Sequence, residues 1–296
     1  MRGFLNLFIV ILMSVFPVSA FAQNFPNQKY EVWPAKDFRF HTGEVAPRLN
    51  IGYNTIGNPS GEVIVILHGT TGTGAGMLSS AFGGELFGPG QPLDAAKYFI
   101  VLPDSIGTGK SSKPSDGLKA QFPKYNYDDM VAAQYRLLTE KLNLKHLRMV
   151  LGNSMGGMQT WLWGVKYPNF MDILVPMASM PSEMSSRNWM MRRLIIDSIR
   201  NDPEWMGGNY VKQTRSLQFA SVLYAIGTNG GTRLSLLGQT RDCFVKLFWC
   251  VRFPPVRQHF LVRGFLLGEG AVGVVQVVHK ITRIGAVFNA VPNELV

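Results

Sequence analysis

The sequence predicts an α/β fold, a doubly wound and mostly parallel sheet that carries a helical cap. Two apolar runs without alternation, residues 63–67 and 98–102, are typical of strands buried on both faces of a parallel sheet. Helix-forming stretches alternate with the strands, which is the pattern of this fold class. At 296 residues and 46% hydrophobic content, the chain can bury one large core, or one core plus a smaller cap.

Residues 1–22 have the features of a secretory signal peptide. Arg2 supplies the charged start, residues 4–16 are nearly all apolar, and Ala20-Phe21-Ala22 fits a small-x-small cleavage site. The apolar run is short for a membrane span, and a retained membrane anchor is the alternative. We expect cleavage near Ala22, membrane contact only during export, and a secreted or periplasmic mature protein.

Residues 23–181 are assigned to the α/β core. Apolar and polar residues alternate near its start, which predicts two short strands between Glu31 and Tyr53. A turn follows at 58–61, where Asn-Pro-Ser-Gly interrupts the strands. The later elements expected in chain order are strands 63–67, 98–102, 148–153 and 172–177, with a helix over 128–142 before the third of them.

The stretch Gly152-Asn153-Ser154-Met155-Gly156 follows a short aliphatic strand and precedes a helix. Gly-x-Ser-x-Gly in this context predicts a nucleophile elbow, a sharp turn on which Ser154 exposes its hydroxyl. A Cβ at Gly152 or Gly156 would crowd the crossing strand and helix. The N–H of Met155 would point at a developing oxyanion. A Gly-rich turn without chemistry is the alternative reading.

The second oxyanion donor is expected in the loop after strand 63–67. Glycines 69 and 72 allow the backbone of this loop to approach a substrate oxygen, and Thr70 or Thr71 would donate. We favour Thr70. His68 is expected to hold the shape of the loop, not to act as general base, because it lies beside the oxyanion site.

Nucleotide and nucleic-acid functions are disfavoured. Residues 107–111 resemble the end of a phosphate-binding loop, but Asp104 stands where that motif needs glycine. The glycines of 69–76 do not fit the dinucleotide spacing. The formal charge of +10 comes from scattered residues, and after Thr232 eight cationic residues accompany only three acids. No His/Cys/Asp cluster has metal-ligand spacing, and no organic cofactor is implied.

Residues 182–232 are assigned to a helical cap over the serine. An amphipathic helix is expected over 187–196, closed by Asp202-Pro203. Its Met, Trp and Arg side chains could line a substrate pocket. Packing of the cap onto the body is the more frequent role of such a stripe, and we favour it.

From about Gly52 to Thr232 the chain resembles the α/β-hydrolase superfamily, and specifically its homoserine O-acetyltransferase-like branch. The stretches that carry the resemblance are 67–72, the loop 104–111, the elbow with its Gly-Gly-Met-Gln extension to Gln159, and Thr228-Asn229-Gly230-Gly231-Thr232. The resemblance implies an α/β-hydrolase fold and an acyl-enzyme on Ser154, with transfer of the acyl group to water or an alcohol.

The C-terminal segment 233–296 departs from this family. The family expects an acid after the seventh strand and a histidine after the eighth, in the order Ser, Asp or Glu, His. Here the candidates are Asp242, His259 and His279, none in the expected context, and Glu183 is a further candidate acid. Cys243 and Cys250, also in this segment, could pair. We interpret the segment as aberrant, through a shift of reading frame; a divergent tail is the alternative.

The sequence therefore predicts a serine acyl hydrolase or acyltransferase acting on a small-molecule acyl ester. Export favours an esterase over homoserine acetylation, because acetyl-CoA belongs to the cytoplasm. The alternative is an inactive or degenerate hydrolase that keeps the elbow but lacks the acid and the base. The sequence does not indicate an oligomeric state.

Overall fold

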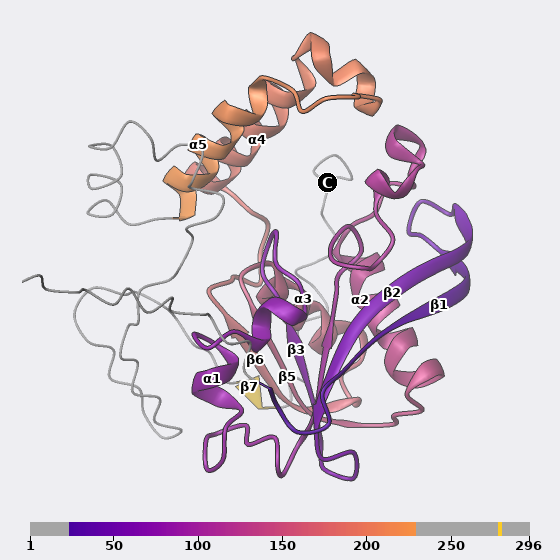
Figure 1. Ribbon diagram of the computed structural model, residues 1–296, viewed down its shortest axis with the longest axis vertical. Coiled ribbons are helices and arrows are strands. Elements are labelled where there is room, and N and C mark those ends of the chain that lie inside the picture. The colour runs from indigo at the N-terminus through magenta and orange to yellow at the C-terminus, as the bar shows by residue number, and fades with distance from the viewer. Residues whose placement is uncertain (1–23, 229–277, 280–296) are drawn as a thin grey trace, which may run out of the picture.

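The computed structural model describes residues 24–228 and 278–279. Within them a seven-stranded sheet has the order β1-β2-β4-β3-β5-β6-β7 (Figure 1). The strands are β1 Lys29–Arg39, β2 Val45–Gly57, β3 Val63–Leu67, β4 Phe99–Pro103, β5 Leu147–Asn153, β6 Met171–Met177 and β7 Val278–His279. The predicted α/β fold class is confirmed.

The centre of the sheet is parallel and its margins are antiparallel. β3 pairs in parallel with β4 on one side and β5 on the other, and β5 pairs in parallel with β6. β1 and β2 form an antiparallel hairpin that joins the sheet through β4, and β7 pairs antiparallel with β6. β3 and β4 are almost entirely buried, as their unbroken apolar runs predict.

Helices cover both faces of the sheet, which makes the fold doubly wound. The helical segments are η1 Ala75–Leu78, α1 Gly83–Leu86, η2 Pro114–Asp116, η3 Lys119–Gln121, α2 Tyr127–Arg136, η4 Leu137–Lys141, α3 Met155–Lys166, α4 Ser186–Arg200, η5 Pro203–Gly208 and α5 Ser216–Thr228. One core cluster packs α2 and α3 against the sheet, and the other packs η1 and α1 against it. The helix predicted over 128–142 is thus α2, extended by the π-helical turn η4.

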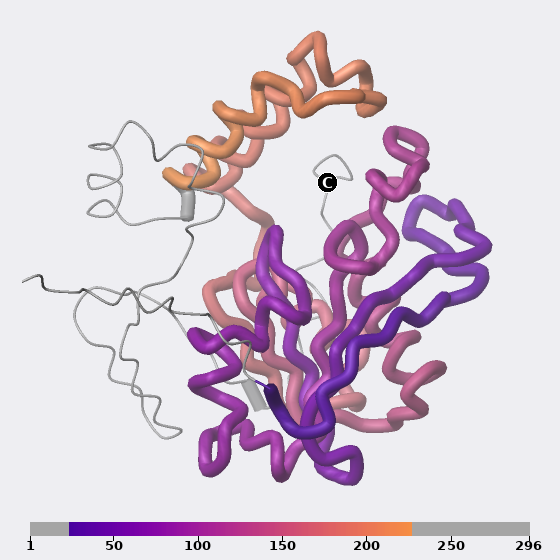
Figure 2. Tube along the Cα trace, viewed as in Figure 1, coloured from indigo at the N-terminus to yellow at the C-terminus, as the bar shows by residue number. Residues whose placement is uncertain are grey.

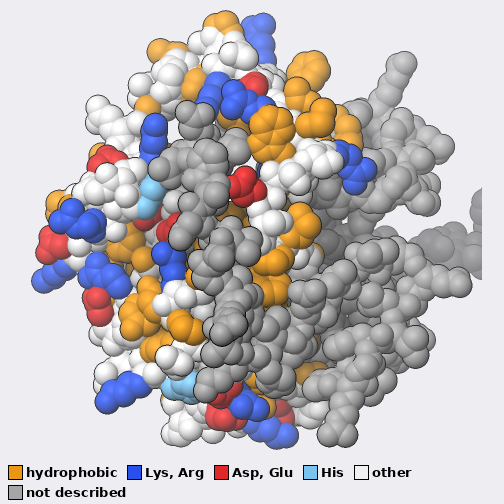
Figure 3. Space-filling view, turned by 180° about the vertical axis from the view of Figure 1, so that it is seen from behind, with side chains coloured by type: hydrophobic (Ala, Val, Ile, Leu, Met, Phe, Trp, Pro, Cys, Tyr) orange, Lys and Arg blue, Asp and Glu red, His pale blue; other side chains and the backbone are white. Residues whose placement is uncertain are grey.

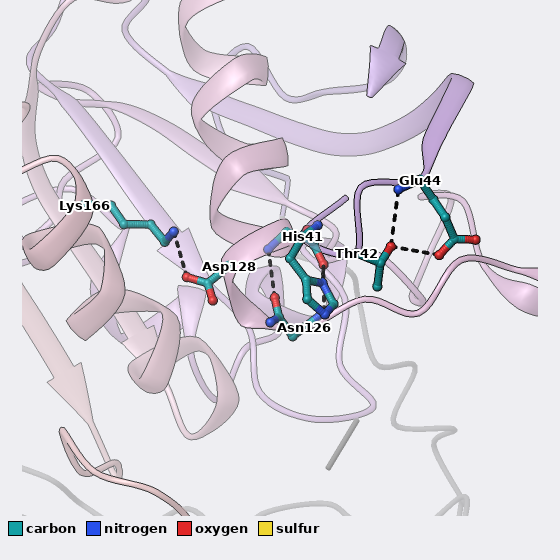
Figure 4. Close-up of polar contacts among 7 residues, drawn as sticks. His41, Thr42, Glu44, Asn126, Asp128 and Lys166 are labelled. Atoms are coloured by element: carbon teal, nitrogen blue, oxygen red, sulfur yellow. Dashed lines mark hydrogen bonds and ion pairs between the residues drawn. The ribbon is translucent and has the colours of Figure 1, made fainter. Parts of the chain in front are cut away.

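The first turn of α2 is tied to the β1–β2 hairpin. Asn126 caps the helix by accepting from the N–H of Asp129 at 3.2 Å. The buried carboxylate of Asp129 accepts from the N–H of His41 at 2.7 Å and lies 2.6 Å from its Nδ1. Asp128, on the same turn, forms an ion pair of 2.7 Å with Lys166 of α3 (Figure 4). These contacts fix the hairpin, α2 and α3 to one another.

A helical hairpin stands apart from the layered core. α4 and α5 run side by side and are joined through η5, and residues 178–185 connect them to the end of β6 (Figures 1 and 2). This hairpin lies within the segment 182–232 assigned to the cap. No helix among residues 24–228 is long and apolar enough to cross a bilayer.

Several predicted features lie outside the described residues. They are the signal peptide 1–22, Asp242, His259, the cysteines 243 and 250, and nearly all of the segment 233–296.

Candidate active site

Ser154 stands on a strained turn between the central strand β5 and helix α3. Its backbone has φ 55° and ψ −113°, a region that a residue with a Cβ occupies only at a cost of about 1–3 kcal/mol. The turn is held from both sides, because the N–H of Ser154 donates to Met177 at 2.9 Å and its carbonyl accepts from Met158 at 3.0 Å. The geometry is that of the predicted elbow.

Glycine is required on both sides of the serine. A Cβ on Gly152 would collide with the carbonyl group of Gly156 and lie 2.5 Å from Oγ1 of Thr160. A Cβ on Gly156 would collide with the Leu67 carbonyl and lie 2.8 Å from that of His68. α3 therefore crosses directly over the carboxyl ends of β3 and β5, which brings its first turn to the serine.

The loop after β3 runs beside Ser154, where an oxyanion site was predicted. A Cβ on Gly69 would lie 3.5 Å from the Cβ of Ser154. Thr71 adopts φ 62°, and a bond of 3.0 Å from the N–H of Gly72 to the Gly69 carbonyl closes the turn. The Thr70 hydroxyl is buried and has no hydrogen-bond partner among the described residues. Met155 is the first residue of α3, where N–H groups have no partner within the helix.

His68 holds this loop in place, as its position in the sequence predicts. It is 1% exposed; Nδ1 lies 2.8 Å from the Gly69 carbonyl, and Nε2 accepts from the N–H of Ser105 at 3.0 Å. A carbonyl only accepts and an N–H only donates, so the ring is the neutral Nδ1–H tautomer. Burial lowers the pKa of His68. Both ring nitrogens are engaged, so His68 is not the base for Ser154.

Asp104 organises the neighbouring loop after β4. Its buried carboxylate accepts from the N–H of Gly74 at 2.7 Å, the N–H of Lys110 at 3.0 Å and the hydroxyl of Tyr30 at 2.8 Å. Burial, and then this carboxylate, raise the pKa of the Tyr30 phenol and keep it a donor. The Asp104 carboxylate thus accepts from backbone N–H groups of both loops and ties the loop after β4 to the loop after β3.

A chain of buried amides behind the elbow was not predicted. The indole N–H of Trp163 donates to Gln134 at 2.9 Å, and Gln134 donates to Gln159 at 2.5 Å. Gln159 in turn donates to the Ser105 hydroxyl at 3.5 Å. Gln134 and Gln159 are almost fully buried, so the chain joins α2, α3 and the loop after β4. The one sequence signal was glutamine at a position of α3 that faces inward.

No described histidine side chain serves Ser154. His41 contacts Asp129, His146 contacts Asp172 at 3.0 Å, and His68 is fully engaged. The backbone of His279 pairs with Ile173, four residues before the end of β6, whereas Ser154 lies beside that end at Met177. Glu183 is exposed on the segment that leads into α4.

The described part of the chain holds no group of three or more His, Cys, Asp and Glu side chains suited to a metal.

The cap hairpin carries both apolar and basic side chains on its surface. Figure 3 shows both kinds interspersed at the top of the molecule. Its exposed apolar residues include Met190, Leu194, Phe219 and Ile226. α5 also reaches the oxyanion loop, because the Tyr224 and Thr71 hydroxyls lie 3.3 Å apart.

A family model described as alpha/beta hydrolase fold matches residues 62–230. A homoserine O-acetyltransferase from Methanosphaera stadtmanae is 32% identical over 199 residues, which are 60% of this chain and 39% of the relative. A probable acyltransferase from Methanothermobacter thermautotrophicus is 30% identical over 196 residues, 64% of this chain and 59% of the relative. The chain thus spans about half the length of the curated relatives it matches.

Among solved structures, the acetyl esterase MekB superposes with a TM-score of 0.64 and 25% identity. The superposition covers 74% of this chain and 67% of the esterase. Both an acyltransferase and an esterase thus share the fold that surrounds Ser154, and the resemblance to the homoserine O-acetyltransferase-like branch is confirmed.

Proposed function

Because this chain belongs to the α/β-hydrolase fold family, we propose that it is a serine acyl hydrolase or acyltransferase that works through an acyl-enzyme on Ser154. The observation that carries the proposal is the positive-φ turn at Ser154, set between β5 and α3 with the 69–72 loop beside it. Residues held in strained backbone conformations cluster at active sites, and this supports a catalytic role for Ser154.

In the proposed reaction Ser154 Oγ attacks the carbonyl carbon of an acyl ester. The N–H groups of Met155 and Thr70 stabilise the oxyanion that forms, and removal of one such donor costs about 3 kcal/mol in the barrier. A base takes the serine proton and returns it to the leaving alcohol as the C–O bond breaks. Water or a second alcohol then attacks the acyl-enzyme and releases the acyl group.

The base comes from a histidine whose side chain is not among those described. The engaged rings of His41, His68 and His146 leave His259 and His279 of the chain's five histidines. Asp242, or Glu183 at the foot of the cap, is the candidate acid. An inactive hydrolase that keeps the elbow without this machinery is the competing function.

For the substrate we propose a small acyl ester, with hydrolysis ahead of transfer. The names of the similar proteins, homoserine O-acetyltransferase and acetyl esterase, both concern acetyl groups.

We also propose that residues 1–22 direct export and are removed. Amino-terminal sequencing of the secreted protein tests this, with a first residue at Gln23 as the expected result and an uncleaved chain as the contrary one.

A fluorophosphonate probe tests the serine directly. We expect the wild-type protein to be labelled and Ser154→Ala to lose the label, because phosphonylation needs an activated hydroxyl. Ser60→Ala, an exposed serine in the turn after β2, is the matched control and keeps the label. Absence of labelling in folded wild-type protein supports the inactive hydrolase instead.

A further inference from the structure

The oxyanion loop is anchored to the core at its two ends and contacts the cap through its middle. His68 and Gly74 anchor the ends through Ser105 and Asp104. Between them, Thr70 has no side-chain partner among residues 24–228, whereas Thr71 meets Tyr224 of α5 at 3.3 Å. A side chain in the middle of the loop is therefore hydrogen-bonded to the cap.

Thr71 is also the strained residue of this loop. Its φ of 62° lies in the left-handed region, which β-branched residues rarely occupy. Such a conformation persists only where surrounding contacts maintain it. Thr70 directly precedes Thr71 in the chain, so a change in the backbone at Thr71 shifts the position of Thr70, the residue proposed as oxyanion donor.

We infer that Tyr224 is a positioning residue that couples the cap to the oxyanion site. Its hydroxyl, hydrogen-bonded to Oγ1 of Thr71, maintains the left-handed turn and thereby aims the Thr70 N–H beside Ser154. The inference rests on the proposed function of Ser154. When the cap moves away, the bond is lost and the donor is released, so full reactivity requires the cap in its seated position.

The position of the cap makes this coupling possible. α5 packs along α4. Gly208 of η5, the segment that joins the two helices, also approaches the rest of the molecule, since an added Cβ would lie 3.0 Å from that of Ala120. Of these two contacts, that of Tyr224 reaches the loop next to the serine.

Tyr224→Phe removes the bond and keeps the ring. Loss of a hydrogen bond worth about 1 kcal/mol predicts roughly five-fold slower phosphonylation of Ser154, and a similar fall in kcat on p-nitrophenyl acetate with KM unchanged. Thr71→Val breaks the same bond from its other end and should also slow phosphonylation, and the double variant should lose less than the sum of the two single losses. Thr71→Ser, which keeps the hydroxyl, restores the rate. Tyr210→Phe, also in the cap, is the matched control.

Hydrogen–deuterium exchange of a peptide covering 69–73 provides a readout that does not depend on catalysis. Exchange should be about five-fold faster in Tyr224→Phe than in the wild type and in Tyr210→Phe. If Tyr224→Phe keeps both the reactivity and the exchange rate of the wild type, the coupling is overturned and the proposed function of Ser154 still stands. An unlabelled wild-type protein overturns the proposed function and the coupling with it.

Discussion

At the scale of single residues, Ser154 and His68 are held by opposite means. Ser154 keeps a conformation that its own chemistry disfavours, because Met177 and Met158 hold its backbone. His68 keeps a protonation state instead, because its two partners accept from one nitrogen and donate to the other. Both residues thereby keep a fixed geometry where β3 and β5 end.

The depressed pKa of His68 makes stability depend on pH. Below the ordinary value of 6.5 the unfolded chain binds a proton that the folded ring does not, so the free energy of unfolding falls as the pH falls. The slope for one proton is at most about 1.4 kcal/mol per pH unit. Urea unfolding between pH 8 and pH 5 should show a steeper loss for wild type than for His68→Gln. Equal slopes for wild type and His68→Gln contradict the assignment.

The pattern of residues predicted Ser154 and its glycines but not the state of His68. Gly-x-Ser-x-Gly is a local constraint, so its meaning can be inferred from five neighbouring residues. The tautomer of His68 depends on Ser105, which lies on another strand's loop, and no local pattern encodes that contact. The buried hydrogen bonds of Gln134 and Gln159 were not predicted for the same reason, because each side chain is paired with a residue on another element.

At the scale of elements, the crossing of α3 over β3 and β5 sets the site. Gly156→Ala places a methyl group against the carbonyls of Leu67 and His68, which cannot move without breaking the parallel ladder. We expect a loss of about 3 kcal/mol in stability and loss of fluorophosphonate labelling. Gly76→Ala is the control, since its Cβ would meet only Thr73 Oγ1 at 3.5 Å. This control should change the free energy of unfolding by less than about 1 kcal/mol. Thermal melting of both variants measures the difference. Equal melting temperatures for the two variants would contradict the close crossing of α3 over the strands.

At the scale of the whole molecule, the fold is predictable as far as its strands follow regular periodicity. The buried runs 63–67 and 98–102 predicted the parallel centre, and the structure places both there. Beyond Thr228 the apolar residues follow neither a helical nor an alternating period, and that part of the chain carries the remaining triad candidates. Their roles depend on contacts that the pattern does not define.

Two substitutions in that segment test whether it contributes the base. If His259 or His279 takes the proton of Ser154, its change to Gln should lower kcat by about 1,000-fold or more while the serine stays in place. The other histidine's variant is the matched control. Equal activity of both variants and wild type means that the chain uses no histidine from this segment.

The reading frame of the gene can be tested independently. Under the proposed frame shift, resequencing across codons 225–296 and translating all frames should show another frame continuing from near Arg233. That frame should carry an Asp-bearing loop and later a Gly-His motif. Confirmation of the present frame, with neither motif elsewhere, favours a divergent tail.

The chain of amides from Trp163 to Ser105 has a consequence for the uniqueness of the fold. Each amide satisfies the next, so α2, α3 and the loop after β4 must assemble together in one register. A slip of α3 by a single residue would leave several polar groups unpaired in the interior, each at a cost of about 1–3 kcal/mol. Competing arrangements of similar hydrophobic content are thereby disfavoured. The single register of α3 also fixes the position of Ser154, which directly precedes the helix, relative to the sheet.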